Sequence, residues 1–135
     1  MNDNLQYNSY KQDTNNDVSD NDKLLAMILY LSSFLTTIII PLIIWLAKKE
    51  KSKFIDFHGK EYFNFRISII IYLVIFFLPY LFVNIMFDSP LLRLISAIPI
   101  IAVSICNIVF LIISAVKSYK GECFKIPIAI RFFNR

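Results

Sequence analysis

The chain has 135 residues, of which 57% are hydrophobic, 16% aromatic and 18% charged, with a formal net charge of +4 at pH 7. Its mean hydropathy of +0.60 is far above the value of a water-soluble domain of this length. The composition therefore excludes an ordinary soluble globular protein, and the length allows one membrane domain. The single histidine and two cysteines provide no ligand set for a metal site, so we expect neither a metal nor another cofactor.

Residues 1–23 are polar, and Asn and Asp dominate them. Five aspartates stand against Lys11 and Lys23, which gives this segment a net charge of −3. Such a segment buries too little apolar surface to offset the conformational entropy that ordering costs. We therefore expect a disordered tail, without the basic start and short apolar core of a secretory signal. A tail that binds a partner is the alternative.

Three later stretches, Leu24–Ala47, Ile67–Phe87 and Leu94–Val116, contain no Asp, Glu, Lys or Arg. At about 1.5 Å per residue, about 20 apolar residues cross a hydrocarbon core of about 30 Å, and each stretch is long enough. We therefore predict an all-α integral membrane protein. Its membrane domain covers residues 24–135, with three transmembrane helices at about residues 24–47, 67–87 and 91–116.

The first of these stretches has an alternative topology. Ser32, Ser33, Thr36 and Thr37 lie in its middle and Pro41 follows them, so it could be a re-entrant hairpin shielded by protein. A spanning helix accounts for the same residues, because Ser32 with Thr36 forms an i,i+4 pair on one face that packs against a neighbouring helix. We favour the spanning helix.

The distribution of basic residues predicts an orientation. Lys and Arg number two in the tail, six in residues 48–66, one between the second and third spans, and five in residues 117–135. Because basic segments stay on the cytoplasmic side, three crossings would leave the N-terminus outside the cell membrane and the C-terminus in the cytoplasm. The Lys-rich loop after the first span should attract anionic lipid.

Between the first two spans, one side of a helix would carry apolar and aromatic residues. The members of this face are Ile55, His58, Tyr62, Phe65 and Ile69. The pattern predicts an amphipathic segment that lies at the membrane interface, with Trp45 marking the boundary. His58 has no companion ligands nearby in the sequence, which argues against a metal site.

The third span carries a polar stripe formed by Ser104, Asn107 and Ser114, which share one helical face with Leu111. Polar groups in hydrocarbon seek partners, so we interpret this face as a helix-packing surface. A polar path for a small solute is the alternative, although the spans lack the ionisable residues that such paths normally use. Cys123 and His58 form no complete catalytic set, and we expect no enzymatic activity.

Several short motifs resemble a bacterial family of small three-span membrane proteins of unknown function, which is grouped distantly with the chloroplast import subunit Tic-twenty. Residues 40–46, 48–49 and 51–54 carry the first part of this resemblance, and residues 130–132 carry the last. The motif residues that are candidates for a role are His58, Gly59, Lys60, Glu61, Asn64, Phe65, Lys120, Gly121, Glu122 and Pro127. The resemblance implies a helical membrane fold with no known chemistry, and an analogy this distant does not transfer a function.

We therefore expect a non-enzymatic membrane protein that associates through its helices, with itself or with another membrane protein. It would present a basic surface to the cytoplasm and bind no nucleic acid. A subunit of a small-solute or peptide transporter, with the Asn107 face lining the path, is one alternative. Protection against a membrane-active peptide is another.

Overall fold

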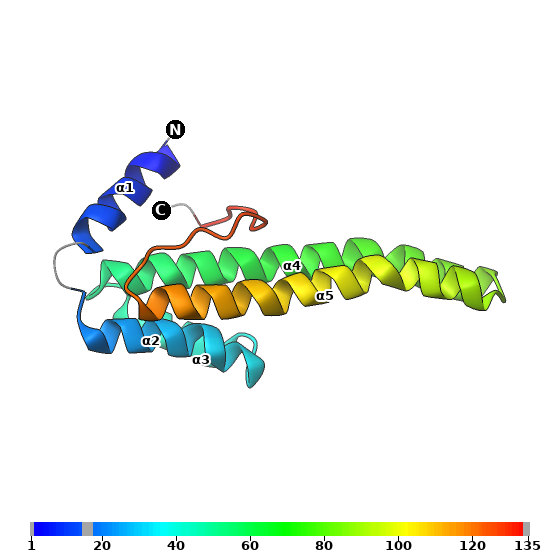
Figure 1. The fold of residues 1–135 in the computed structure, drawn as a ribbon, viewed down its shortest axis with the longest axis horizontal. Coiled ribbons are helices and arrows are strands. Elements are labelled where there is room, and N and C mark those ends of the chain that lie inside the picture. The colour runs from blue at the N-terminus through cyan, green and yellow to red at the C-terminus, as the bar shows by residue number, and fades with distance from the viewer. Residues whose placement is uncertain (1, 15–17, 134–135) are drawn as a thin grey trace.

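The computed structural model describes residues 2–14 and 18–133, and every regular element in these ranges is helical. In chain order they are α1 (Asn2–Thr14), α2 (Asp20–Leu31), the 3₁₀ turn η1 (Ser32–Phe34), α3 (Ile39–Lys48), α4 (Lys53–Met86) and α5 (Pro90–Tyr119). An irregular segment, residues 121–133, follows α5 and runs back along α4 (Figure 1); we call it the C-terminal strap. The all-α prediction is confirmed for the part of the chain that the structure describes.

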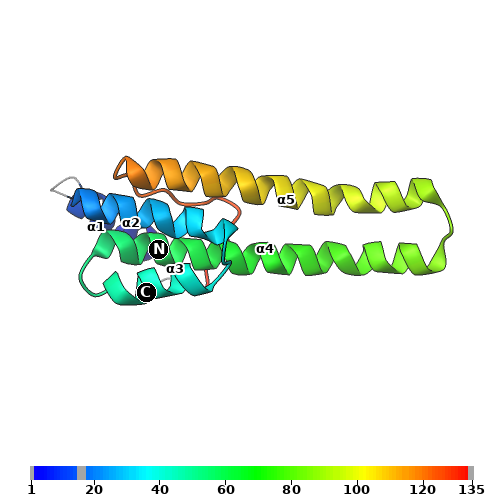
Figure 2. The same ribbon diagram turned by 90° about the horizontal axis from the view of Figure 1, so that it is seen from below.

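Helices α4 and α5 form a long antiparallel hairpin (Figure 2). Their 34 and 30 residues correspond to about 51 and 45 Å, so each is longer than the hydrocarbon core of about 30 Å. Both are long and apolar enough to cross a membrane, and they contain the second and third predicted spans. Helix α5 begins at Pro90 directly after Ser89, whose hydroxyl makes no capping hydrogen bond.

The first predicted span, residues 24–47, is wrong as a single helix. The chain leaves α2 after Leu31, passes through η1, and turns back into α3 from Ile39. Helices α2 and α3 lie against each other and against the base of α4, so this region has the hairpin topology that we considered the weaker alternative. The three predicted crossings are therefore not confirmed.

Pro41 lies in the first turn of α3, a position that proline tolerates, and α2 already ends at Leu31. Pro41 has no N–H to donate to the Thr37 carbonyl four residues earlier, which a continuous helix would require. In the structure the Tyr62 hydroxyl donates to that carbonyl over 2.5 Å. The hydroxyls of Ser32 and Ser33 donate to the carbonyls three residues before them over 3.0 and 2.6 Å, which favours termination of α2.

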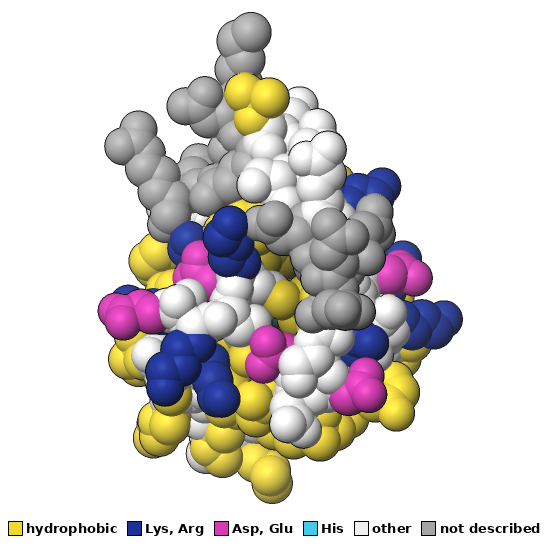
Figure 3. Space-filling view, turned by 90° about the vertical axis from the view of Figure 1, so that its left-hand side faces the viewer, with side chains coloured by type: hydrophobic (Ala, Val, Ile, Leu, Met, Phe, Trp, Pro, Cys, Tyr) yellow, Lys and Arg dark blue, Asp and Glu magenta, His cyan; other side chains and the backbone are white. Residues whose placement is uncertain are grey.

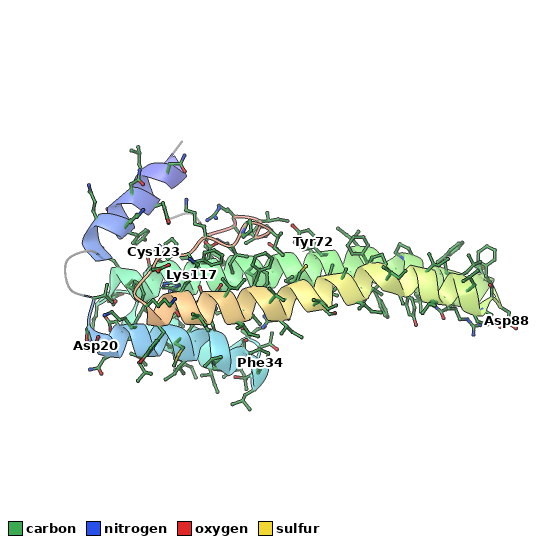
Figure 4. The ribbon with its side chains drawn as sticks, in the orientation of Figure 1. Asp20, Phe34, Tyr72, Asp88, Lys117 and Cys123 are labelled. Atoms are coloured by element: carbon green, nitrogen blue, oxygen red, sulfur yellow. The ribbon has the colours of Figure 1, made fainter. Side chains whose placement is uncertain are left out.

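One end of the molecule is much thicker than the other. Helices α1, α2 and α3 surround the beginning of α4 and the end of α5, together with the C-terminal strap, and we call this assembly the head (Figure 1). The loop between α4 and α5, which contains Asp88, lies at the opposite end (Figure 4). Both described ends of the chain therefore belong to the head.

The base of α4 is buried in the head and does not lie flat at an interface. The predicted apolar face forms much of the core, since Ile55, His58, Tyr62, Phe65 and Ile69 are all buried. Helices α2 and α5 cover this face, and α4 continues without a break into its apolar half. The prediction of an interfacial amphipathic segment is therefore wrong, because protein and not lipid covers the face.

Helix α1 lies within the segment that we expected to be disordered. Its rings Tyr7 and Tyr10 pack against Phe57 of α4, at centroid distances of 6.1 and 5.3 Å. The Tyr7 hydroxyl also donates to the Cys123 carbonyl of the strap over 3.1 Å. Because the two terminal segments touch, the structure does not support the prediction that they lie on opposite sides of the membrane. Residues 1 and 15–17 of the tail, and 134–135 of the membrane domain, lie outside the described residues.

Candidate functional site

A row of polar side chains follows one face of α4. Glu61, Asn64, Ser68 and Tyr72 are spaced by three, four and four residues, which places them one above another on the helix. The first three are buried and Tyr72 is half-buried. We call these four residues the polar ladder.

The polar ladder binds the C-terminal strap through the backbone of the strap. Asn64 Oδ1 accepts hydrogen bonds from the amides of Phe132 and Phe133 over 2.9 and 2.7 Å. Asn64 Nδ2 donates to the Phe133 carbonyl over 3.2 Å. The Ser68 hydroxyl accepts from the Ile130 amide over 2.6 Å, and the Tyr72 hydroxyl donates to the Ile128 carbonyl over 2.9 Å. Side chains thus satisfy strap backbone groups that no helix or sheet pairs.

Glu61 adds the one ion pair of the ladder. Its carboxylate accepts from the Ile126 amide over 2.5 Å and from the two terminal guanidinium nitrogens of Arg131 over 3.1 and 3.4 Å. The Glu61 side chain is only 3% exposed, whereas Arg131 remains partly exposed. A shift of the strap along α4 would separate Arg131 from Glu61 and leave a buried carboxylate without this partner, which is costly. The pair therefore fixes the register of the strap on α4.

Arg66 marks the point on α4 where the charge-free stretch begins. Its two terminal nitrogens donate to the Tyr62 hydroxyl over 3.3 Å and to Asn107 Oδ1 over 3.4 Å. Asn107, predicted to pack against another helix, therefore meets a charged group of α4. Of the other residues predicted to pack helices, Ser114 and Ser32 are buried. Ser104 is exposed, and its hydroxyl donates to a carbonyl within α5. The Thr36 hydroxyl accepts from the Ile40 amide at the start of α3.

A second group of contacts fixes α3 against α4. The Asp56 carboxylate accepts from Trp45 Nε1 over 3.0 Å and from Lys60 Nζ over 2.5 Å. The Trp45 ring lies directly over Gly59, where an added Cβ would meet ring carbons of the indole. Gly59 is therefore required for this close approach. Beside it, His58 Nδ1 lies 3.0 Å from the Tyr30 hydroxyl of α2.

The turn after α5 directs the strap toward the ladder. Gly121 has a φ of 79°, which an L side chain adopts only with strain, and it follows Lys120 at the end of the helix. The Glu122 carboxylate accepts from Lys117 Nζ over 3.0 Å, and this ammonium lowers the pKa of Glu122. Pro127 is exposed at the outer edge of the strap.

The structure thus brings the two halves of the sequence motif together in the head. The candidates at positions 58–65 line the base of α4, and those at positions 120–127 form the turn and the strap that folds onto it. We did not single out Tyr30, Ser68 or Tyr72. The spacing of polar residues along α4 could have indicated Ser68 and Tyr72, whereas no local pattern indicates Tyr30.

The arrangement supplies hydrogen bonds and three ion pairs, Arg131 with Glu61, Lys60 with Asp56 and Lys117 with Glu122, and these are used within the chain. Among the described residues there is no group of three or more His, Cys, Asp or Glu that could hold a metal ion. Cys123 is buried beside Phe54 and Phe57 and forms no disulfide, and Cys106 is a free, exposed cysteine on α5.

Comparison of the sequence with protein families assigns the chain. A sequence model of the MamF/MmsF family, described as the magnetosome magnetite crystal formation protein family, matches residues 21–133. The chain belongs to the MamF/MmsF family. The match extends from α2 through the strap and omits α1. Membership in a family of small bacterial membrane proteins is what the motifs predicted. The wider grouping with Tic-twenty stays a prediction. Neither the curated proteins nor the solved structures contain a match.

Proposed function

We propose that this MamF/MmsF protein is a non-enzymatic component of a bacterial membrane. Helices α4 and α5 anchor it, and the head remains at the cytoplasmic face, where it contacts anionic lipid and other membrane proteins. The family description names magnetite crystal formation, which a structural membrane component can serve without a catalytic site of its own.

The observation that carries this proposal is the uneven distribution of basic residues. Twelve of the described Lys and Arg residues lie in the head, and Arg93 lies near the loop at the opposite end. Arg93 is paired with Asp88 over 2.9 Å, which leaves the loop neutral. Viewed from the head end, Lys and Arg side chains spread over the surface together with acidic ones (Figure 3). The positive-inside rule therefore favours a cytoplasmic head.

The two-crossing hairpin changes the orientation that we propose. Both described ends of the chain belong to the head, so helix α1 and the C-terminal strap would share the cytoplasmic side. The tail contributes Lys11 and Lys23 to that side, which agrees with the same rule. Only the loop around Asp88 would face the opposite compartment.

Association with lipid and protein would use different parts of the molecule. Lys48 ends α3, and Lys49 and Lys51 follow it; each basic residue near an anionic surface contributes about 1 kcal/mol of attraction. The outer half of α4 exposes large apolar side chains such as Phe77 and Phe82, which lipid or a neighbouring membrane helix would cover. A solute path along Asn107 has less support, because Arg66 already binds that amide.

Thiol labelling of intact cells tests the orientation. In a chain with Cys106→Ala and Cys123→Ala, we would introduce Asp88→Cys at the loop or Phe133→Cys in the strap. An impermeant maleimide should label the loop variant in intact cells, and the strap variant only after lysis. If the strap variant were labelled before lysis and the loop variant were not, the orientation would be the reverse of the one we propose. The chain without cysteines serves as the blank.

A further inference from the structure

The hairpin of α2, η1 and α3, which we call the wedge (residues 20–48), exposes an unusual amount of apolar surface. Leu35 at its turn is 83% exposed, and other large apolar side chains are exposed around the turn and along α3. These are Leu31, Phe34, Ile38, Ile39, Ile43 and Leu46. A contiguous patch of this kind on a protein surface indicates a partner or a membrane. Figure 3 shows the hydrophobic side chains gathered along the lower edge of the head, the side that α2 and α3 occupy in Figure 1.

The position of the turn shows where this patch lies relative to the membrane. The hydrogen bond from Tyr62 to the Thr37 carbonyl places the turn beside α4, four residues before Arg66. The charge-free half of α4 begins directly after Arg66, and its exposed side chains Ile70 and Val74 continue the apolar surface. The tip of the wedge is therefore adjacent to the membrane-spanning part of the hairpin.

The opposite end of the wedge has the character of a membrane interface. Trp45 lies in the last turn of α3, and the ammonium of Lys49 lies 5.6 Å from the centre of its ring. Lys48 and Lys51 are close in the chain. Tryptophan and lysine are the residues that gather at the boundary between acyl chains and headgroups, and lysine attracts anionic headgroups. Asp20 and Asp22 at the start of α2 lie at the same end, so the base is charged and aromatic. An apolar tip with such a base matches the change from acyl chains to headgroups within a single leaflet.

The dimensions agree with one leaflet. The ten residues of α3 extend over about 15 Å, which is half of a hydrocarbon core of about 30 Å. Helix α4, at about 51 Å, is too long to stand upright within a bilayer of about 40–45 Å, and a tilt of about 30–40° brings it to that thickness. Figure 1 draws α1 and most of the strap above α4 and the wedge below it, although the Phe133 ring at the end of the strap lies 6.0 Å from the Trp45 ring of the wedge. A tilt toward the wedge would therefore immerse the apolar tip first.

From these observations we infer that the wedge is inserted among the acyl chains of the anionic leaflet on the head side, as a re-entrant hairpin that does not cross the membrane. The inference extends the proposed function and rests on its membrane anchor. Two extra helices then occupy area in one leaflet and none in the other. The protein should consequently concentrate in membranes whose head-side leaflet is convex.

Quenching by lipid measures the depth of the wedge. In the chain without cysteines, Leu35→Cys at the tip would carry an environment-sensitive fluorophore. Val74→Cys on α4 is the control for contact with lipid, and Leu5→Cys on α1 is the control for a position in water; both native side chains are exposed, by 53% and 69%. The vesicles would contain phosphatidylglycerol and a phosphatidylcholine brominated in its acyl chains.

We expect the fluorophore at position 35 to be quenched to nearly the same extent as that at position 74, while position 5 is unaffected. If the fluorophore at position 35 were as little quenched as that at position 5, the tip would lie in water and the inference would be overturned. Blue-shifted emission without quenching would also overturn it, because a second copy of the chain would then cover the patch. A loss of quenching at position 74 would refute the membrane anchor itself, so the two failures are distinguishable.

Discussion

The strongest test of the site concerns Asn64, which joins the strap to α4. Asn64→Leu conserves the approximate size of a buried side chain and removes three hydrogen bonds to the backbone of Phe132 and Phe133. At roughly 0.5–1.5 kcal/mol net for each bond, the loss amounts to about 3 kcal/mol. Since about 1.4 kcal/mol corresponds to a tenfold change in an equilibrium constant, the strap should open about 100-fold more often.

Trypsin provides the assay, because Arg131 lies in the strap and its peptide bond is cleaved only when the strap is detached. Cleavage follows the population of the open form when opening and closing are fast relative to proteolysis. In detergent micelles, mass spectrometry should show cleavage after Arg131 about 100-fold faster in the variant. Asn84→Leu is the matched control, since Asn84 lies on the same helix and bonds only to the Tyr80 carbonyl. Equal cleavage rates in the Asn64 variant and the unaltered protein would refute the role assigned to the ladder.

Three further substitutions test the head. Gly59→Ala should displace the Trp45 ring, shift its fluorescence to longer wavelength and cost about 1–3 kcal/mol of stability, measured as a lower thermal midpoint; an unchanged spectrum would contradict the close approach. Tyr62→Phe removes the donor that replaces the bond blocked by proline, and it should cost about 1–3 kcal/mol in the same assay. Arg131→Gln leaves Glu61 buried without its cation and should destabilise the protein by about 3–5 kcal/mol, whereas a loss below 1 kcal/mol would show that the pair is dispensable.

The sequence predicted the two long helices because their signal is local. Absence of charge over more than 20 residues is sufficient to indicate a helix that can cross a bilayer, and both α4 and α5 satisfy it. The start of α5 was equally local, since Pro90 can occupy only the first turn of a helix without losing a hydrogen bond.

The break between α2 and α3 was harder to predict because composition does not distinguish a crossing from a turn. Residues 24–47 are as free of charge as the apolar parts of α4 and α5. The turn is held against α4 by a contact across 25 residues, in which the Tyr62 hydroxyl donates to the Thr37 carbonyl. A pattern along the chain cannot show that such a donor is available.

The face from Ile55 to Ile69 illustrates a similar limit. Its periodicity correctly grouped residues that the structure buries together, yet periodicity is the same whether lipid or protein covers the face. The polar residues on the neighbouring face of α4 contained the missing information. Glu61 and Asn64 followed by Ser68 would be costly on a helix that faces lipid, and this cost is avoided because the strap pairs with them.

In the topology that we propose, the chain crosses the membrane twice and residues 24–47 return to the side from which they start. The most direct test compares Asp20→Cys and Glu50→Cys, which flank this region, in the chain without cysteines. With an impermeant maleimide on sealed vesicles of known sidedness, both variants should be labelled from the same side, and Asp88→Cys from the other. Labelling of positions 20 and 50 from opposite sides would contradict the account and restore three crossings.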